Sequence, residues 1–79
     1  MNIYLLTQHD RTGYDTYDSC AVYAASEDEA RQIHPNEAMG WTWKSSYWAY
    51  SPENVEVSYL GRNPNVTDSG LILASFKAG

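Results

Sequence analysis

The sequence has one cysteine, Cys20, among its 79 residues. A lone cysteine cannot form an intramolecular disulfide or a thiolate zinc site. Because Cys20 lies in an apolar run, we expect a small buried side chain in a reducing compartment. The sequence also lacks a glycine-rich phosphate loop, and Ser19 has no recognisable His and Asp partners for nucleophilic catalysis. We therefore expect no enzymatic activity and no cofactor.

Basic residues are also scarce. Five Lys and Arg residues oppose ten Asp and Glu residues, which gives a formal net charge of -5. A negative protein is repelled by nucleic-acid phosphates and anionic membranes, so we expect no direct nucleic-acid binding and no membrane binding. The charge favours a basic protein partner, but many soluble domains carry a similar charge for solubility alone. Both explanations stay open.

Long apolar runs are absent, and none approaches the roughly 20 residues of a membrane-spanning helix. Met1 leads directly into apolar residues, without the positive stretch or cleavage site of a secretory signal. We therefore expect a cytoplasmic protein. The length predicts a single domain with a thin core, in which the seven Tyr, three Trp and one Phe supply much of the buried area.

Apolar and alternating segments predict β-strands over residues 2–8, 19–25, 55–60 and 71–76. The polar connection over residues 9–18 predicts a hairpin with a long tip between the first two strands. Residues 55–60 alternate apolar and polar side chains, which is typical of a strand near an edge. Residues 71–76 are apolar on both faces, which predicts a position inside the sheet.

A helix start is the strongest local signal. Ser26 and Glu29 have the spacing of a capping box, in which each side chain bonds the other's main-chain N–H. Ala30 and Ile33 are three residues apart and are predicted to face the sheet. Pro35 disfavours helical geometry at the preceding residue, which predicts an end at His34. At this helix end, His34 is expected to interact with the last carbonyls.

Together these elements predict an α+β fold, with an antiparallel four- to five-stranded sheet and one short helix packed on one face, in the order β-β-α-(β)-β-β. The optional strand contains Trp41 and Trp43. These rings belong to an aromatic segment, residues 41–50. It is expected to cap the core, or alternatively to expose Trp41, Trp43 and Trp48 as a protein–protein interaction module.

The polar connection is also the place to look for a metal site, because it contains His9, Asp10, Asp15 and Asp18. The spacing lacks the glycine and terminal glutamate of a calcium loop. Turn formation and solvation explain these residues better, since Asp side chains bond their own backbone in turns. We therefore expect no metal ion.

Acidic residues lie on both sides of the second predicted strand. If the first loop folds toward the helix start, they form one negative patch, to which Asp10 would add. Carboxylates spaced along a surface imitate duplex phosphates and compete for a basic groove. The local alternative is a helix first turn plus a hydrophilic loop. The predicted partner-binding residues are Asp15, Asp18, Glu27, Asp28 and Glu29.

Four segments together resemble small proteins of bacteriophages and prophages: residues 13–19, 26–35, 51–61 and 70–79. They read GYDTYDS, SEDEARQIHP, SPENVEVSYLG and GLILASFKAG, and the resemblance runs nearly end to end. Some small acidic phage proteins are anti-CRISPR inhibitors. The resemblance implies a non-enzymatic inhibitor of a type I interference complex, which occupies a nucleic-acid-binding surface of a Cas effector protein in the bacterial cytoplasm. We expect a monomer with this host defence protein as partner.

Overall fold

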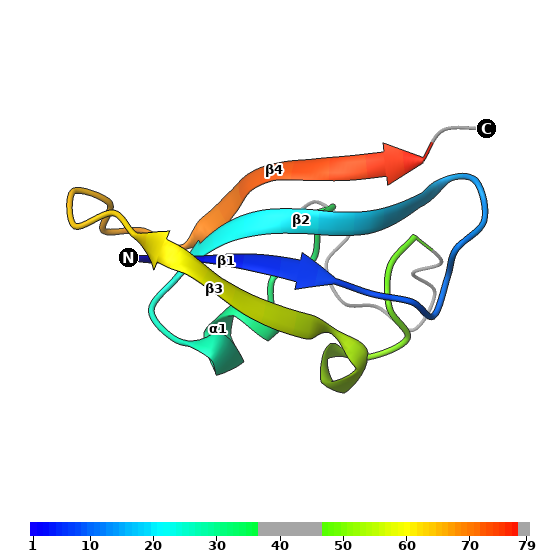
Figure 1. The fold of residues 1–79 in the computed structure, drawn as a ribbon, viewed down its shortest axis with the longest axis horizontal. Helices are drawn as coiled ribbons and strands as arrows, with labels where there is room; N and C mark the ends of the chain where they lie inside the picture. The colour runs from blue at the N-terminus through cyan, green and yellow to red at the C-terminus, as the bar shows by residue number, and fades with distance from the viewer. Residues whose placement is uncertain (37–46, 78–79) are drawn as a thin grey trace.

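A computed structural model describes residues 1–36 and 47–77 of the chain. Four strands form one antiparallel sheet in the order β3-β1-β2-β4 (Figure 1). The elements are β1 (Asn2–Thr7), β2 (Thr16–Ala24), α1 (Glu27–Arg31), the 3-10 helix η1 (Pro52–Asn54), β3 (Glu56–Arg62) and β4 (Gly70–Lys77). The predicted α+β class, with an antiparallel sheet and one short helix, is confirmed.

The β1–β2 hairpin forms the centre of the sheet. Leu6 pairs with Cys20 and Tyr4 with Val22, which places these side chains on one face. β2 begins at Thr16, three residues earlier than predicted, because the polar residues before Ser19 pair with β4. Asp18 is an extra residue in this ladder, since Tyr17 pairs with Phe76 and Ser19 with Ser75. Such a bulge bends the strand where turn-like composition predicts a loop.

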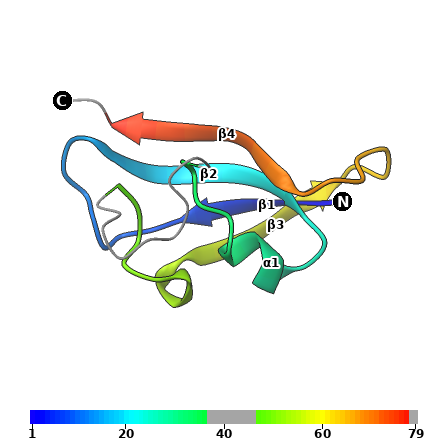
Figure 2. The ribbon, with the colours of Figure 1, turned by 180° about the vertical axis from the view of Figure 1, so that it is seen from behind.

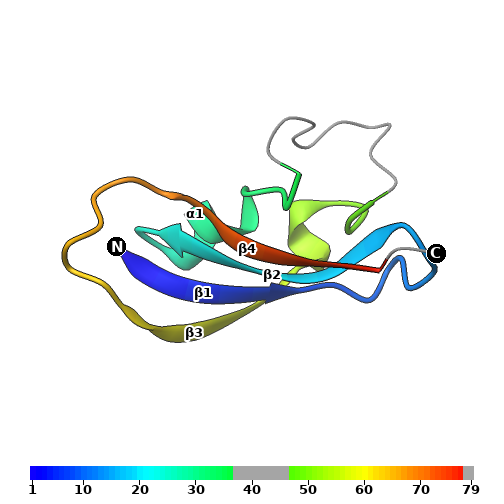
Figure 3. The same ribbon diagram turned by 90° about the horizontal axis from the view of Figure 1, so that it is seen from above.

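One face of the sheet is covered by α1 and η1 (Figures 2 and 3). The core lies between these elements and the sheet. Its largest fully buried side chains are Trp48, Leu6, Val22, Val55 and Cys20. Ala30 of α1 is buried and Ile33 packs against the core, as predicted. The predicted helix end at His34 is wrong, because α1 ends at Arg31 and Ile33 follows it in a tight turn that bonds its N–H to the carbonyl of Ala30. No described element covers the opposite face, which we call the open face.

β4 lies at an edge of the sheet, not inside it as its apolar composition predicts. The hairpin pairs with β3 through β1 and with β4 through β2, so both C-terminal strands add to the outside. Leu73 and Phe76 consequently remain 62% and 44% exposed. The prediction that β3 is an edge strand is confirmed.

The aromatic segment is only partly described. Trp48 is fully buried, so its predicted role in capping the core is confirmed, and its exposure in an interaction module is contradicted. Tyr50 is exposed. Trp41, Trp43 and the strand predicted around them lie outside the described residues. Within the described residues, no helix has the length and apolar character needed to cross a membrane.

Candidate functional site: the acidic face of α1 and η1

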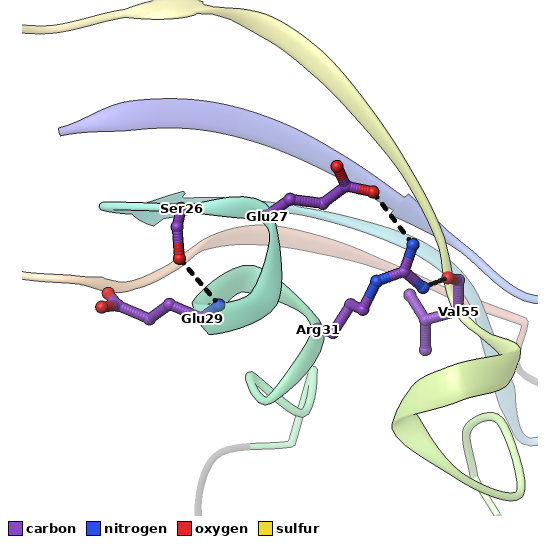
Figure 4. Close-up of polar contacts among 5 residues, drawn as sticks. All are labelled: Ser26, Glu27, Glu29, Arg31 and Val55. Atoms are coloured by element: carbon purple, nitrogen blue, oxygen red, sulfur yellow. Dashed lines mark hydrogen bonds and ion pairs between the residues drawn. The ribbon is translucent and has the colours of Figure 1, made fainter.

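The start of α1 is fixed by local sequence signals. The Ser26 hydroxyl accepts a hydrogen bond from the Glu29 main-chain N–H at 3.2 Å (Figure 4). The Glu29 carboxylate in turn accepts from the N–H of Ala25 at 3.3 Å, not from that of Ser26 as the predicted capping box requires. The first contact satisfies an N–H group that the first helical turn leaves unpaired, and the second ties the residue before the N-cap to the helix. Glu29 therefore stabilises the start of α1 as well as contributing a negative charge to the surface.

Arg31 anchors α1 to the segment that enters β3. Its Nη2 lies 3.0 Å from the Glu27 carboxylate, and its Nη1 donates to the carbonyl oxygen of Val55 (Figure 4). The Arg31 side chain is 27% exposed, so this contact is sheltered from water on most sides. Because Val55 is buried in the core, Arg31 fixes the position of α1 relative to η1.

A surface pocket of about 410 Å³ lies between α1 and η1. Asp28 and Glu53 both line it, together with Arg31, Gln32 and Pro52. Hydrogen bonds from its own main-chain N–H and from the Ser51 hydroxyl lower the pKa of Glu53 below its usual value, and Arg31 adds to this. Glu53 is therefore ionised at neutral pH, and it lines the same pocket as Asp28.

We call this surface the acidic face and define it by Glu27, Asp28, Glu29 and Glu53. Arg31 lies among these carboxylates and is engaged by Glu27 and Val55. Sequence reasoning found the three helix residues but missed Glu53. The signal for Glu53 is its place directly after Pro52, in the first turn of η1, where an acidic residue is favoured.

The structure does not bring the five predicted partner-binding residues together. Asp15 precedes β2 and Asp18 lies near its start, whereas Glu27–Glu29 follow its other end. The six residue steps of β2 from Asp18 to Ala24, at about 3.3 Å each, extend roughly 20 Å from the first group toward the second. Since charges are screened over about 8 Å at physiological salt, the two groups do not act as one patch. The physical reason is that β2 stays extended over its full length.

Asp18 also has basic neighbours. It lines a second pocket of about 390 Å³ with Arg11 and Lys77, and with Thr7 and Ser19. Thr7 and Ser19 pair across β1 and β2 on the face opposite the buried Leu6, so this pocket lies on the open face. The basic side chains of Arg11 and Lys77 beside the Asp18 carboxylate give this end of the sheet charges of both signs. The predicted negative patch is therefore confined to the acidic face.

Asp10 joins two loops. Its Oδ2 accepts hydrogen bonds from the Tyr50 main-chain N–H at 3.0 Å and from the Asn54 side-chain amide at 2.9 Å. These two bonds lower the pKa of Asp10, because they favour the ionised carboxylate. Asp10 thus acts as a structural tie between the hairpin loop and η1. Among the described residues, no group of three or more His, Cys, Asp or Glu side chains is placed to hold a metal ion.

Comparisons of this chain with protein-family models, with curated proteins and with solved structures find no match.

Proposed function

We propose that this protein is a non-enzymatic inhibitor that binds a basic, nucleic-acid-binding surface of another protein through the acidic face. The observation that supports this is that Asp28 of α1 and Glu53 of η1 line one pocket, while Glu27 is exposed in the first turn of α1. Carboxylates from two separate elements thus share one surface. A basic groove built for phosphates would attract such a surface electrostatically.

The proposed partner class is a Cas effector subunit. The support for this part is the resemblance of four segments to phage and prophage proteins, which implies an anti-CRISPR role against a type I complex. An inhibitor of this kind needs no catalytic group, because occupying the groove is sufficient to exclude the nucleic acid. The proposed action is competition with DNA in the bacterial cytoplasm.

A matched pair of double variants tests the site. Asp28→Asn with Glu53→Gln removes two charges from the acidic face, and neither side chain caps or anchors α1. Asp15→Asn with Asp18→Asn removes the same charge from the other end of β2, and asparagine tolerates the left-handed geometry of Asp15, whose φ is 60°. If the acidic face binds, the first variant loses affinity at least tenfold, about 1.4 kcal/mol, whereas the second changes it less than about threefold.

The measurement is binding to a purified type I effector complex, with target DNA as competitor and at several salt concentrations. Affinity is expected to fall as salt rises, because the attraction between exposed charges is screened. Circular dichroism checks that each variant is folded. Equal losses in the two double variants would mean that net charge alone drives binding. The absence of any competition with DNA would contradict the proposed mode of inhibition.

A further inference from the structure

β4 presents an outer edge that no other described strand occupies. Its strand neighbour within residues 1–36 and 47–77 is β2, on one side only. Figure 1 shows β4 at the border of the sheet, next to β2. Leu73 is 62% exposed and Phe76 is 44% exposed, although both belong to large apolar residue types. An accessible apolar edge is a template for pairing with another strand.

The two edge strands of this sheet differ in the features that prevent pairing with a strand of another chain. β3 carries Glu56 at one end and Arg62 at the other, and its Leu60 is left unpaired between Tyr59 and Gly61 in the ladder with β1. Charges and bulges of this kind discourage edge-to-edge association. β4 also has one extra residue, Ile72, but it is charged at one end only, by Lys77, and no charge occurs from Gly70 to Phe76. The contrast indicates that β4 is the edge suited to a partner.

The direction of the main-chain groups of β4 follows from one contact. The carbonyl oxygen of Lys77 accepts a hydrogen bond from the N–H of Asp15, on the side of β4 that faces β2. Main-chain groups alternate in direction along an antiparallel strand. The N–H and C=O groups of Phe76 and Ala74 therefore point to the outer edge, where a further strand can bond them.

We infer that the occupant of this edge is β4 of a second copy of the chain, paired in antiparallel orientation about a twofold axis. Asp68 and Lys77 are exposed and lie on either side of the uncharged run 69–76. Antiparallel pairing centred on this run places the Lys77 end of each copy beside the Asp68 end of the other. The edge is thus self-complementary in charge, as an isologous interface must be.

Pairing would also extend the open face. Leu73 pairs with Ala21, which pairs with Leu5, so these three side chains share the face opposite the core. Two copies joined through β4 form a continuous eight-stranded sheet, in which Leu73 of each copy gains a neighbouring strand. This inference replaces the expected monomer with a dimer and does not depend on the proposed function, because the acidic face contributes no residue to it.

Charge reversal across the edge tests the pairing without altering the apolar run. Asp68→Lys and Lys77→Asp each bring like charges together at both ends of the interface, and each is expected to raise the dimer dissociation constant about tenfold. The combined variant restores opposite charges and is expected to return to within about threefold of the parent chain. Sedimentation velocity between about 10 μM and about 1 mM measures the equilibrium, with 8.9 kDa as the monomer mass.

Hydrogen exchange locates the interface in the unmodified chain. The amides of Ala74 and Phe76 are expected to become protected as concentration rises, while amides on the outer edge of β3 are not. Ala74→Pro removes an outward N–H and is expected to abolish the dimer. A chain that stays monomeric up to about 1 mM would overturn the inference. A dimer whose dissociation constant is unchanged by both charge reversals would also overturn it. A dimer in which the β3 amides are protected while the β4 amides exchange freely would overturn it as well.

Discussion

The side-chain amide of Gln8 donates a hydrogen bond to the main-chain carbonyl of Tyr17, with 2.8 Å between Nε2 and the oxygen. The same Nε2 donates to the carbonyl of Arg11 at 2.7 Å, and Oε1 accepts from the N–H of Arg11 at 2.9 Å. Gln8 is 2% exposed. A single buried amide therefore closes the loop between β1 and β2, by satisfying main-chain groups that no strand pairs.

Gln8→Glu tests this role because it changes the donor to an acceptor at constant shape. The carboxylate oxygen would face the carbonyls of Arg11 and Tyr17, so we expect a loss of about 2–4 kcal/mol in the free energy of unfolding at pH 7. The site would raise the pKa of the new carboxyl. Part of the loss should therefore disappear as pH falls to about 5 and protonation restores one donor.

Urea unfolding of the variant and the parent chain at both pH values measures this difference. Gln32→Glu is the matched control, because Gln32 is exposed and the same change there should cost less than about 0.5 kcal/mol. Equal stability of Gln8→Glu and Gln32→Glu at pH 7 would contradict the proposed role of Gln8.

Trp48 is the largest fully buried side chain, and its indole N–H has no hydrogen-bond partner among the described residues. Trp48→Ala is expected to cost about 3–5 kcal/mol, because it leaves a cavity in a thin core. Trp48→Phe should cost less, about 1–2 kcal/mol, because it removes less volume and also removes the unpaired N–H. Thermal and urea unfolding test the order, with the exposed Tyr14→Ala as a control near zero. A larger loss for Trp48→Phe than for Trp48→Ala would contradict this account.

The local signals predict the start of α1, but they predict neither its end nor the strand order, because α1 ends at Arg31 and not at His34. Ser26 and Glu29 act within one turn, so the sequence alone places the start of α1. Strand order depends instead on which edges of the hairpin are free, and apolar composition does not encode that. Leu73 and Phe76 suggest burial, yet they lie on an edge strand. If β4 pairs with a second copy, its composition reflects the assembly and not the single chain.

The separation of Asp15 and Asp18 from the three helix carboxylates has a related reason. Composition suggests a loop up to Asp18, but Tyr17 and Asp18 belong to β2. An extended strand carries Asp18 away from Glu27, whereas a loop would have allowed them to approach. Glu53 lies far from α1 in sequence, and the Arg31–Val55 contact that joins α1 to η1 is one that no local pattern predicts.

The thiol of Cys20 is expected to be unreactive in the folded protein. It is 1% exposed, and burial raises the pKa of its thiol to about 12. Because the thiolate is the reactive form, labelling by a disulfide reagent at pH 8 should proceed only through unfolding, at least about 10³-fold more slowly than in urea. Cys20→Ser with Ser19→Cys moves the thiol to the open face and should react rapidly. Equally fast reaction of the parent chain would show that Cys20 is accessible.

His34 makes stability depend on pH. It is 3% exposed, and its Nδ1 accepts a hydrogen bond from the N–H of Asn36 at 3.0 Å, so the bonded ring nitrogen carries no proton. Loss of hydration lowers the pKa of His34 below its usual value of 6.5. The unfolded chain therefore binds a proton that the folded chain does not, once pH falls below 6.5. The free energy of unfolding therefore keeps the full contribution of neutral His34 above pH 6.5. It decreases as pH falls below that value, by at most about 1.4 kcal/mol per pH unit for one proton.

His34→Gln keeps a hydrogen-bond acceptor and cannot take up this proton. We expect it to flatten the dependence of the unfolding free energy between pH 7 and about 5.5, even if the variant is less stable throughout. His9→Gln is the control, because it removes an exposed imidazole and leaves the buried His34 in place. Urea titrations at closely spaced pH values measure both slopes. If His34→Gln retained the full slope, another group would have to carry the acid sensitivity.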